Sequence, residues 1–311
     1  MTAYLIRRLL YTVPIVFGVA LVVFVLFNVA GGDPVLIMMG KHGNPQLMDE
    51  LRRELGLDQP LWIQFISYLK QIVTFDFGRS YASKQQISAM ILEGVGPSLL
   101  IAIPAFTITT VLAVLTALTV SYFRGALVDR IVLVASVFGM SFPSLGIILF
   151  GQYFLAYKWQ LFPIAGYSSG FPDAISYVAL PVIIWVLVSL GTDVRFFRTA
   201  ILDEVGQDYI RTARAKGLSE YRVFLKHVLR NSLVPIITYV VIQIPFLILG
   251  SLLLESFFGI PGLGHIVIDA VNNSDFPVLK AMTTVLSILY IFGTVVTDIL
   301  YKLADPRVSF K

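Results

Sequence analysis

Residues Pro97–Tyr122 read PSLLIAIPAFTITTVLAVLTALTVSY, and no charged side chain interrupts them. A helix needs about 20 apolar residues to cross the hydrocarbon core of a bilayer. Lipid offers backbone amides and carbonyls no hydrogen-bond partner, so such a stretch spans as a helix. This run therefore predicts a membrane-spanning helix.

The composition of the whole chain agrees with a membrane protein. Of its 311 residues, 57% are hydrophobic and 14% are charged, and the mean hydropathy is +0.83. A soluble domain carries roughly a quarter of its residues as charged ones. The chain has no cysteine, which excludes disulfides and thiolate metal sites. We predict no metal site and no nucleic-acid partner.

Six windows are long and apolar enough to span, so the sequence predicts an all-α membrane protein with six transmembrane helices. The windows are Leu9–Val29, Pro97–Tyr122, Ile131–Tyr157, Tyr177–Leu190 (continuing to about Phe197), Leu233–Leu254 and Ala281–Leu303. The first window has an alternative interpretation as a signal peptide. Its apolar run is about twice the usual length for one, and Asn28–Ala30 is a poor cleavage site, so a retained helix is favoured.

Lysine and arginine predict the orientation. With the N-terminus inside, 15 of the 23 basic residues fall on the inner side, and most of the others lie in one long external segment. Short inner loops of membrane proteins are enriched in these residues. We therefore expect both termini in the cytoplasm.

Residues 30–96 are too polar to span and are expected outside. Asn44-Pro45 is typical of a helix start and Gly56 of a helix stop. A second amphipathic helix is predicted around Trp62–Val73. These helices either pack against the membrane helices, which is favoured, or dock an external partner.

Glycine and proline mark two further interruptions of the helical pattern. Residues 255–280 contain Gly259-Ile260-Pro261-Gly262-Leu263-Gly264, which is incompatible with a regular helix. This run is either a re-entrant turn or a tight loop, and Ser141-Phe142-Pro143-Ser144 is the expected flexible point of the third window.

Residues 198–232 form a long inner loop with a charged helix. Acidic residues come early and basic ones late, an order that suits the helix dipole, and Gly217 is expected to end the helix. Asp208 and Arg211 are spaced to pair. Small Ala213 and Ala215 would let another surface approach. The helix either lies on anionic lipid or contacts a soluble partner.

Several motifs in order give this chain a resemblance to a known family. It resembles the dipeptide/oligopeptide permeases of ABC importers, in particular the B-type first permease. The matching segments are Gly32-Asp33-Pro34, Glu54–Pro60, Phe75–Ser80, Asp208–Gly217, His227–Pro235, Pro261–Gly264, Asp298–Tyr301 and Asp305-Pro306-Arg307. Arg211 replaces the glutamate of the wider importer signature but fits the peptide branch, and Asn272–Pro277 is looser than the family pattern.

The resemblance implies a type I ABC importer permease fold in a bacterial or archaeal cytoplasmic (inner) membrane. It also implies a second homologous permease subunit, two cytoplasmic ATP-binding subunits that hold ATP and Mg, and an external substrate-binding protein. Three parts follow: 1–29 with the first helix, the external segment 30–96, and a five-helix core 97–311 with the coupling loop 198–232. The implied contacts with the ATPase are Asp208, Tyr209, Arg211, Thr212, Ala213, Arg214, Ala215, Lys216 and Gly217.

The chain itself is expected to be no enzyme and to bind no cofactor. Gly40-Lys41-His42 resembles a phosphate loop only superficially, because the spaced glycine and the Ser/Thr are missing. ATP would thus be hydrolysed by a partner. Polar groups at membrane depth are candidate pathway residues. They are Ser141, Gln152, Gln243 and Glu255.

The expected cargo is dipeptides or short oligopeptides. Nickel and glutathione remain alternatives, because transporters of both use this permease type. From other classes, an ATP-independent channel, an intramembrane enzyme and a structural subunit stay open. Uptake measured with and without ATP and a binding protein separates a channel from an importer.

Overall fold

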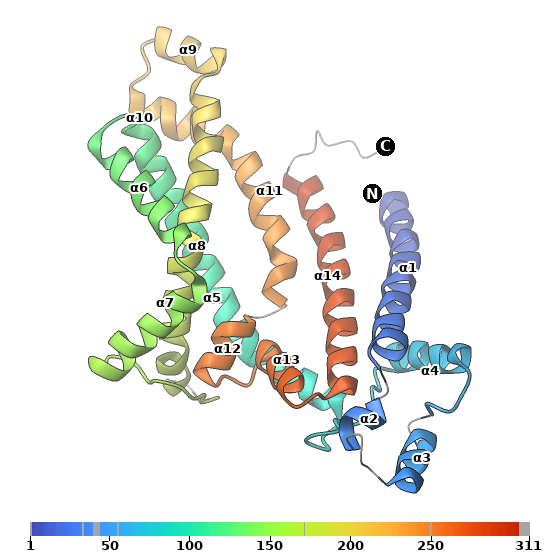
Figure 1. Cartoon of the computed structure of the whole chain (residues 1–311). Helices are drawn as coiled ribbons and strands as arrows, with labels where there is room; N and C mark the ends of the chain where they lie inside the picture. The colour runs from blue at the N-terminus through green and yellow to red at the C-terminus, as the bar shows by residue number, and fades with distance from the viewer. Residues whose placement is uncertain are drawn as a thin grey trace. The chain divides into compact units, whose positions relative to one another are not determined.

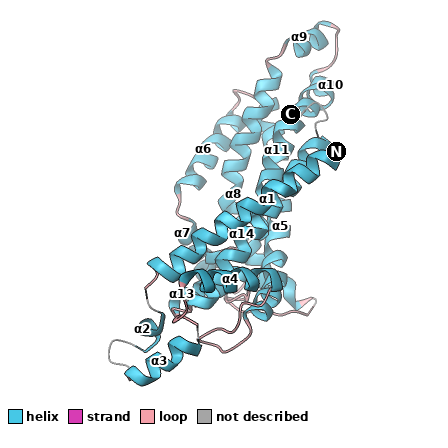
Figure 2. Ribbon diagram, turned by 90° about the vertical axis from the view of Figure 1, so that its right-hand side faces the viewer, coloured by secondary structure: helices cyan, strands magenta, loops and turns pink. Residues whose placement is uncertain are grey.

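The computed structural model describes residues 2–32, 34–39, 44–54, 56–170, 172–248 and 251–304. Among these residues every regular element is a helix, apart from one isolated bridge between Arg79 and Gln86 (Figures 1 and 2). The predicted all-α class is therefore confirmed. Motif residues Asp33, Gly40, Lys41, His42, Leu55, Asp305, Pro306 and Arg307 lie outside the described part, as do both chain ends.

Most helices follow one another closely, and the longest connections are residues 75–86 and 159–172. Their bounds are α1 Thr2–Val25, η1 Leu26–Ala30, α2 Pro34–Met39, α3 Pro45–Glu54, α4 Leu61–Thr74, α5 Ile87–Tyr122, α6 Leu127–Ser141, α7 Ser144–Gly151, η2 Gln152–Lys158, α8 Asp173–Val205, α9 Asp208–Ala215, α10 Glu220–Val223, η3 Phe224–Val228, α11 Leu229–Ile248, α12 Leu252–Phe258, α13 Leu263–Asn272 and α14 Phe276–Ala304.

The chain divides into two compact units. Unit 1 comprises Met1–Ser98, Ile248–Ser256 and Pro261–Val295, and unit 2 comprises Leu99–Leu247, Phe257–Ile260 and Val296–Lys311. The division of the chain at 29 and 96 stays a prediction.

Five helices are long and apolar enough to cross a membrane, and the number rises to seven if each of two bent pairs is one span. The five are Leu10–Val29, Ile87–Tyr122, Asp173–Val205, Glu220–Leu247 and Phe276–Thr297. The chain is thus a multi-pass helical membrane protein, and a count of six stays a prediction.

The third window is not one straight span. It breaks between Ser141 and Ser144, where α6 and α7 meet at 94°. The ring of Pro143 clashes with a helical conformation at the preceding residue, and Phe142 is extended at φ −83° and ψ 132°. The break lies at the point that the sequence singled out as flexible.

The fifth window also ends earlier than expected. Helix α11 stops at Ile248, and residues up to Leu254 belong in part to a separate helix, α12. Helices α12 and α13 form the second bent pair, at 80°. A bent pair agrees with the re-entrant interpretation of the Gly259–Gly264 run.

The two amphipathic helices of the segment 30–96 are confirmed. Asn44 accepts a hydrogen bond on its side chain from the amide of Gln46 at 3.0 Å, which starts α3. Gly56 has a φ of +65° just beyond the end of α3. In unit 1, Phe65 and Tyr68 of α4 pack with Phe24 of α1, which confirms packing against the first membrane helix.

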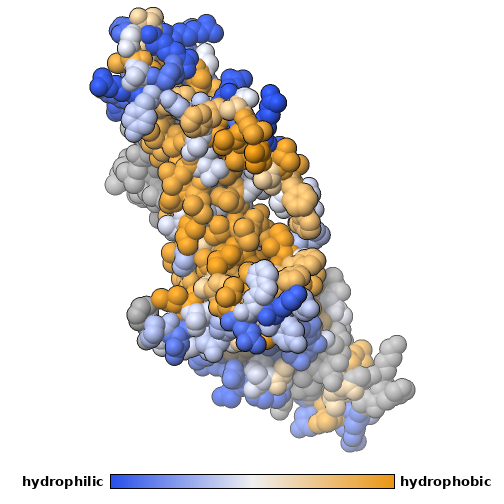
Figure 3. All heavy atoms as spheres, turned by 90° about the vertical axis from the view of Figure 1, so that its left-hand side faces the viewer, coloured by the Kyte–Doolittle hydropathy of each residue, from blue (hydrophilic) through white to orange (hydrophobic). Residues whose placement is uncertain are grey.

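In unit 2, one hydrophobic core joins the last turns of α8 to α9, α10 and η3. Its buried members include Phe197, Ile201, Ile210, Val223 and Val228. On the face shown in Figure 3, hydrophilic side chains gather at the end that carries α9, and apolar side chains cover the adjoining stretch. The core therefore fixes a polar end onto an apolar helical body.

Candidate functional site

Helix α9 is the short charged helix that the sequence predicts. It runs from Asp208 to Ala215 and lies with α10 at the end of α8 (Figure 1). Gly217 follows with a φ of +78°, and its amide donates to the carbonyl of Arg214 at 2.9 Å. This left-handed position suits glycine, so the predicted helix stop is confirmed.

One side of α9 faces the core of its own unit. Ile210 is fully buried and Ala213 is 6% exposed, and both pack with Val223 and Phe224. The small side chain of Ala213 thus lets α9 pack closely against α10 and η3 of the same chain. The expected contact of Ala213 with a partner stays untested. Because Ala213 is buried, its exposed neighbours on α9 are better placed to make such a contact.

The opposite side of α9 is open to solvent. Asp208, Arg211, Thr212, Ala215 and Lys216 are all exposed. Arg211 and Asp208 approach to 3.5 Å, which confirms the predicted pairing, but their side chains are 76% and 95% exposed. A pair so solvated contributes little to folding, which leaves both charges available to another surface.

A second ion pair closes the turn after α9. The Nε of Arg214 donates to Oε1 of Glu220 at 2.7 Å, and its second nitrogen donates to Oε2 at 3.1 Å. Such a bidentate geometry fixes both the distance and the orientation of the two groups. Arg214 therefore holds the loop in shape, whereas Arg211 has no comparable structural bond.

Tyr209 links α9 back to α8. Its hydroxyl donates to the carboxylate of Glu204. Partial burial, helped by this bond, raises the pKa of the Tyr209 hydroxyl, which keeps it protonated as a donor. The position of α9 is thus set from both of its ends.

Glu255 forms the centre of the bent pair α12–α13. It is fully buried, and its carboxylate accepts hydrogen bonds from the hydroxyl of Ser98 at 2.9 Å and from backbone amides of three residues. Those amides belong to Ser251 (3.0 Å), Gly264 (2.7 Å) and His265 (3.3 Å). A buried carboxylate that accepts hydrogen bonds from four donors stabilises the turn. Glu255 therefore has a structural role in this turn.

The glycines of this turn are required by close approaches. A Cβ atom on Gly264 would lie 2.8 Å from the Cα and the amide nitrogen of Leu252. A Cβ on Gly262 would overlap the carboxylate of Glu255. The Pro261–Gly264 motif therefore lets two backbone segments meet around one acid.

The other candidate pathway residues have different surroundings. The hydroxyl of Ser141 donates to the carbonyl of Val137 at 2.8 Å, at the break between α6 and α7. Gln152 donates to the carbonyls of Ile164 (3.1 Å) and Phe257 (2.8 Å), which fixes the loop that follows η2.

Gln243 lines a cavity. This cavity within unit 2 has a volume of about 250 Å³, and Thr109, Asp193 and Tyr239 also line it. The Tyr239 hydroxyl donates to Asp193 at 2.8 Å, and the hydroxyl of Thr109 is buried without a partner among the described residues. The cavity thus presents polar groups between α5, α8 and α11, three helices long and apolar enough to span a membrane.

Two motifs far apart in sequence meet in unit 1. The hydroxyl of Ser80 donates to Asp275 at 2.5 Å, and the amides of Tyr81 and Ala82 donate to the same carboxylate at 3.2 Å each. Burial and the nearby Asp275 raise the pKa of Tyr81 to about 12. The Phe75–Ser80 and Asn272–Pro277 segments are therefore two halves of one contact.

Comparison with known proteins identifies the class. Residues 109–310 match the family described as binding-protein-dependent transport system inner membrane component, and residues 1–99 match its N-terminal family. A Brucella abortus (strain 2308) protein, named as a permease of a peptide transport system, is 34% identical over the full length of both chains. The glutathione transport system permease protein GsiC of Escherichia coli (strain K12) is 33% identical, also over the full length of both.

The chain belongs to this permease family. It is a membrane component of an ABC transport system of the peptide/glutathione type, and its relatives are permease components rather than enzymes. Partner subunits that bind substrate and hydrolyse ATP are general to such systems. The recognised family is thus confirmed.

Sequence reasoning missed one polar contact of this permease near α9. Arg198 of α8 donates to both oxygens of Asp129 in α6, at 2.8 and 2.9 Å, and Asp129 also accepts from the amide of Gly125 at 2.9 Å. The side chains are 17% and 5% exposed. Asp129 lies in the first turn of α6, shortly after Gly125, and this arrangement could have indicated that its carboxylate accepts from the backbone at the helix start.

Proposed function

We propose that this chain is the permease subunit of an ATP-driven importer that translocates dipeptides or short oligopeptides from an external binding protein. A second homologous permease completes the membrane body. Two cytoplasmic subunits bind ATP and Mg and hydrolyse the nucleotide. Both termini and α9 face the cytoplasm.

The observation that supports this proposal most is the two-sided environment of α9. Its inner side is fixed in the hydrophobic core by Ile210 and Ala213, while Arg211 and Lys216 extend into solvent. A helix held rigidly by its own unit transmits force applied to its outer side. A helix lying on lipid would instead place its apolar side in the membrane, and here that side is already occupied.

The contact with the ATPase is assigned to the exposed residues of the coupling loop. They are Asp208, Tyr209, Arg211, Thr212, Arg214, Ala215, Lys216 and Gly217. Ala213 supports this surface from beneath. An effector can shift a conformational equilibrium only through a difference in its contacts with the two states, so this surface must hold the partner in both.

The cargo is proposed as peptidic on two grounds. One relative is named for peptide transport and another for glutathione transport, and glutathione is itself a small peptide. In addition, no group of three or more His, Asp and Glu side chains that suits a metal ion occurs in the described part of the chain. Peptides are therefore favoured over nickel. Gln243, in its polar cavity, is the preferred candidate on the pathway.

Arg211→Glu tests the coupling role. Arg211 makes no strong bond to another described residue, so its reversal should leave the fold intact and repel a partner surface that accepts a cation. We expect uptake of labelled dipeptide by the reconstituted transporter to fall at least about tenfold, in line with roughly 1.4 kcal/mol or more of lost interaction. ATP hydrolysis should lose its stimulation by the binding protein.

Two further variants control this test. Arg130→Glu makes the same change at an exposed arginine of another predicted inner loop and should transport normally. The double variant Arg214→Glu with Glu220→Arg keeps an ion pair between positions 214 and 220 but exchanges the places of the positive and the negative charge. Normal coupled uptake by Arg211→Glu would refute the coupling role of α9.

An ATP-independent channel is the second candidate, supported only by the polar cavity around Gln243. Uptake into vesicles without ATP and without the binding protein decides the matter. Flux that persists under those conditions favours the channel, and its loss favours the importer.

A further inference from the structure

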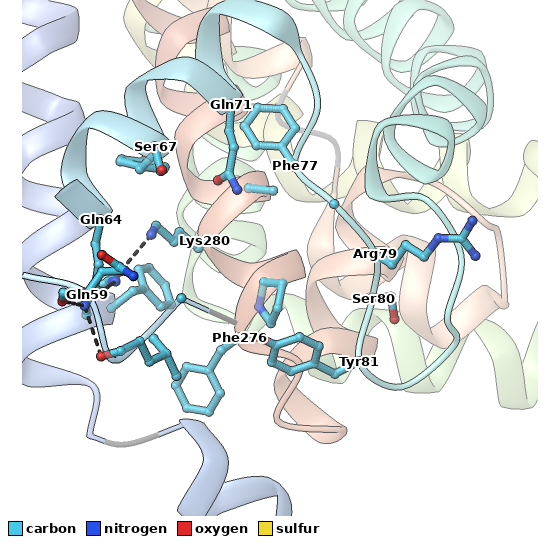
Figure 4. A pocket seen from close by; sticks show the side chains of 18 of the residues that line it. Gln59, Gln64, Ser67, Gln71, Phe77, Arg79, Ser80, Tyr81, Phe276 and Lys280 are labelled. Atoms are coloured by element: carbon cyan, nitrogen blue, oxygen red, sulfur yellow. Dashed lines mark hydrogen bonds between the residues drawn. The ribbon is translucent and has the colours of Figure 1, made fainter. Parts of the chain in front are cut away.

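Unit 1 holds a second, larger cavity that the coupling mechanism does not use. Its volume is about 570 Å³, within the range of roughly 300–1,000 Å³ for small-molecule sites. Its walls come from η1, α4, the loops at 56–59 and 77–84, and the start of α14 (Figure 4). The proposed topology places residues 30–96, and hence this cavity, on the outer side.

Lys280 lies in this cavity with neutral partners only. Its ammonium donates to Oδ1 of Asn28 at 2.7 Å and lies 4.1 Å and 5.1 Å from the ring centres of Tyr68 and Phe24. No described carboxylate forms an ion pair with it. A partly buried ammonium of this kind retains a strong attraction for an anion.

The orientation of Asn28 is fixed by a second bond. Its side-chain nitrogen donates to Oε1 of Gln64 at 2.9 Å, and Gln64 in turn donates to the carbonyl of Gln59 at 2.8 Å. The oxygen of Asn28 must therefore face Lys280. This chain of bonds holds the ammonium in one place, as a binding site requires.

The charge of the cavity has one sign. The charged groups among its described lining residues are Arg79, Lys84 and Lys280, and all three are basic. Asp58, between the lining residues Leu57 and Gln59, is exposed, and two further acids beside lining residues are already engaged. Asp275 accepts from Ser80 and from two amides, and Asp76 accepts from the amide of Gly78 at 3.3 Å.

A free amide completes the set of donors. The side chain of Gln71 points into the cavity (Figure 4) and makes no hydrogen bond to another described residue. An ammonium and an amide nitrogen are suitable donors for the two oxygens of one carboxylate. The rings of Phe276 and Tyr81 add apolar wall nearby.

We propose that this cavity binds the carboxylate of a small solute, with Lys280 as its counter-ion and Gln71 as a second donor. The assignment of that solute to transported cargo rests on the proposed function. A site of this charge selects peptides with a free carboxyl end and repels free divalent metal ions.

Direct binding tests the proposal without ATP or partner subunits. The full chain in phosphatidylcholine nanodiscs is titrated by calorimetry with alanyl-alanine and with alanyl-alanine amide, which lacks the carboxylate. Alanyl-alanine should bind at least about tenfold more tightly than the amide, because a hydrogen-bonded charge pair contributes that much or more. Equal binding of the two would overturn the proposal.

Variants then locate the site. Lys280→Met should reduce alanyl-alanine binding to the level of the amide, while Lys280→Arg should stay within a few-fold of the parent. Lys158→Met makes the same change at an exposed lysine outside the cavity and should bind normally. Undiminished binding by a folded Lys280→Met refutes the site. If that variant does not fold, the comparison of the two ligands on the parent chain still decides.

A lipid phosphate is the competing anion, and native mass spectrometry distinguishes it. Phosphatidylglycerol retained by the parent but lost from Lys280→Met, with no alanyl-alanine binding, would overturn the assignment to a solute. The binding test and the coupling test are independent. If alanyl-alanine does not bind but Arg211→Glu still abolishes coupled uptake, only the proposed cavity site is refuted. If alanyl-alanine binds but Arg211→Glu transports normally, only the proposed coupling role is refuted.

Discussion

The α9 loop and the α12–α13 turn both depend on a glutamate, yet they use it in opposite ways. Glu220 pairs with Arg214 in solvent, where the two side chains are 52% and 37% exposed. Glu255 pairs with no cation among the described residues and is fully buried among four donors. Exposed charges tolerate change and so reveal function, whereas a buried carboxylate that satisfies backbone amides determines whether the turn forms.

The largest expected effect comes from removing the buried acid. Glu255→Leu leaves two buried and two partly buried donors without an acceptor, at about 1–3 kcal/mol for each buried unsatisfied group, partly relieved by relaxation. We expect the apparent melting temperature of the detergent-solubilised chain to fall by roughly 10 °C or more. Fluorescence-detected size exclusion after heating measures this.

Matched variants sharpen that result. Glu220→Leu removes the exposed glutamate of the α9 loop and should shift the melting temperature by only about 2 °C. Glu255→Gln keeps one acceptor oxygen and should fall between the two. Similar losses for Glu220→Leu and Glu255→Leu would contradict the contrast between the two regions.

Gly264→Ala should destabilise the same turn by a smaller amount than loss of the acid. Its added methyl would meet the backbone of Leu252 rather than a movable side chain, so the turn must shift at a cost of about 1–3 kcal/mol. Gly96→Ala is the matched control, because nothing lies within 4 Å of its new methyl. The yield and the melting temperature of the folded chain are measured for both variants. Equal stability of the two variants would show that the turn is looser than described.

The smallest effect is expected in the α9 loop itself. Arg214→Met breaks a solvent-exposed pair and should cost about 0–1 kcal/mol. Arg198→Met, the same change in the half-buried pair with Asp129, should cost about 3–5 kcal/mol, because it leaves a buried carboxylate uncompensated. If thermal unfolding ranks these two the other way, burial does not determine the strength of ion pairs here.

Local signals in the sequence predicted much of the fold. Asn44 and Gly56 bound α3, Gly217 ends α9, and Pro143 marks the break between α6 and α7. Each of these depends on the conformation of a few neighbouring residues, which a sequence displays directly. The bend of 94° at Pro143 was beyond this reasoning, because its size depends on what the two helices pack against.

Contacts between distant segments were not predictable. Asp275 and Ser80 are 195 positions apart, and the two motifs that contain them carry no sign of their pairing. The apolar side of α9 was recognisable, but Ile210 and Ala213 suit the core of the chain and a partner surface equally well by composition. The structure places Val223 and Phe224 against Ile210 and Ala213, which shows that these two residues contact the core of the chain.

The bond between Ser80 and Asp275 has a consequence for how the chain matures. Ribosomes add about 5–20 residues per second, so the loop at 77–84 waits roughly 10–40 s after its synthesis before its acceptor exists. During that interval the donors of Ser80, Tyr81 and Ala82 lack the carboxylate that accepts from them in the folded chain. Synthesis as far as Asp275 is therefore required before this contact can form.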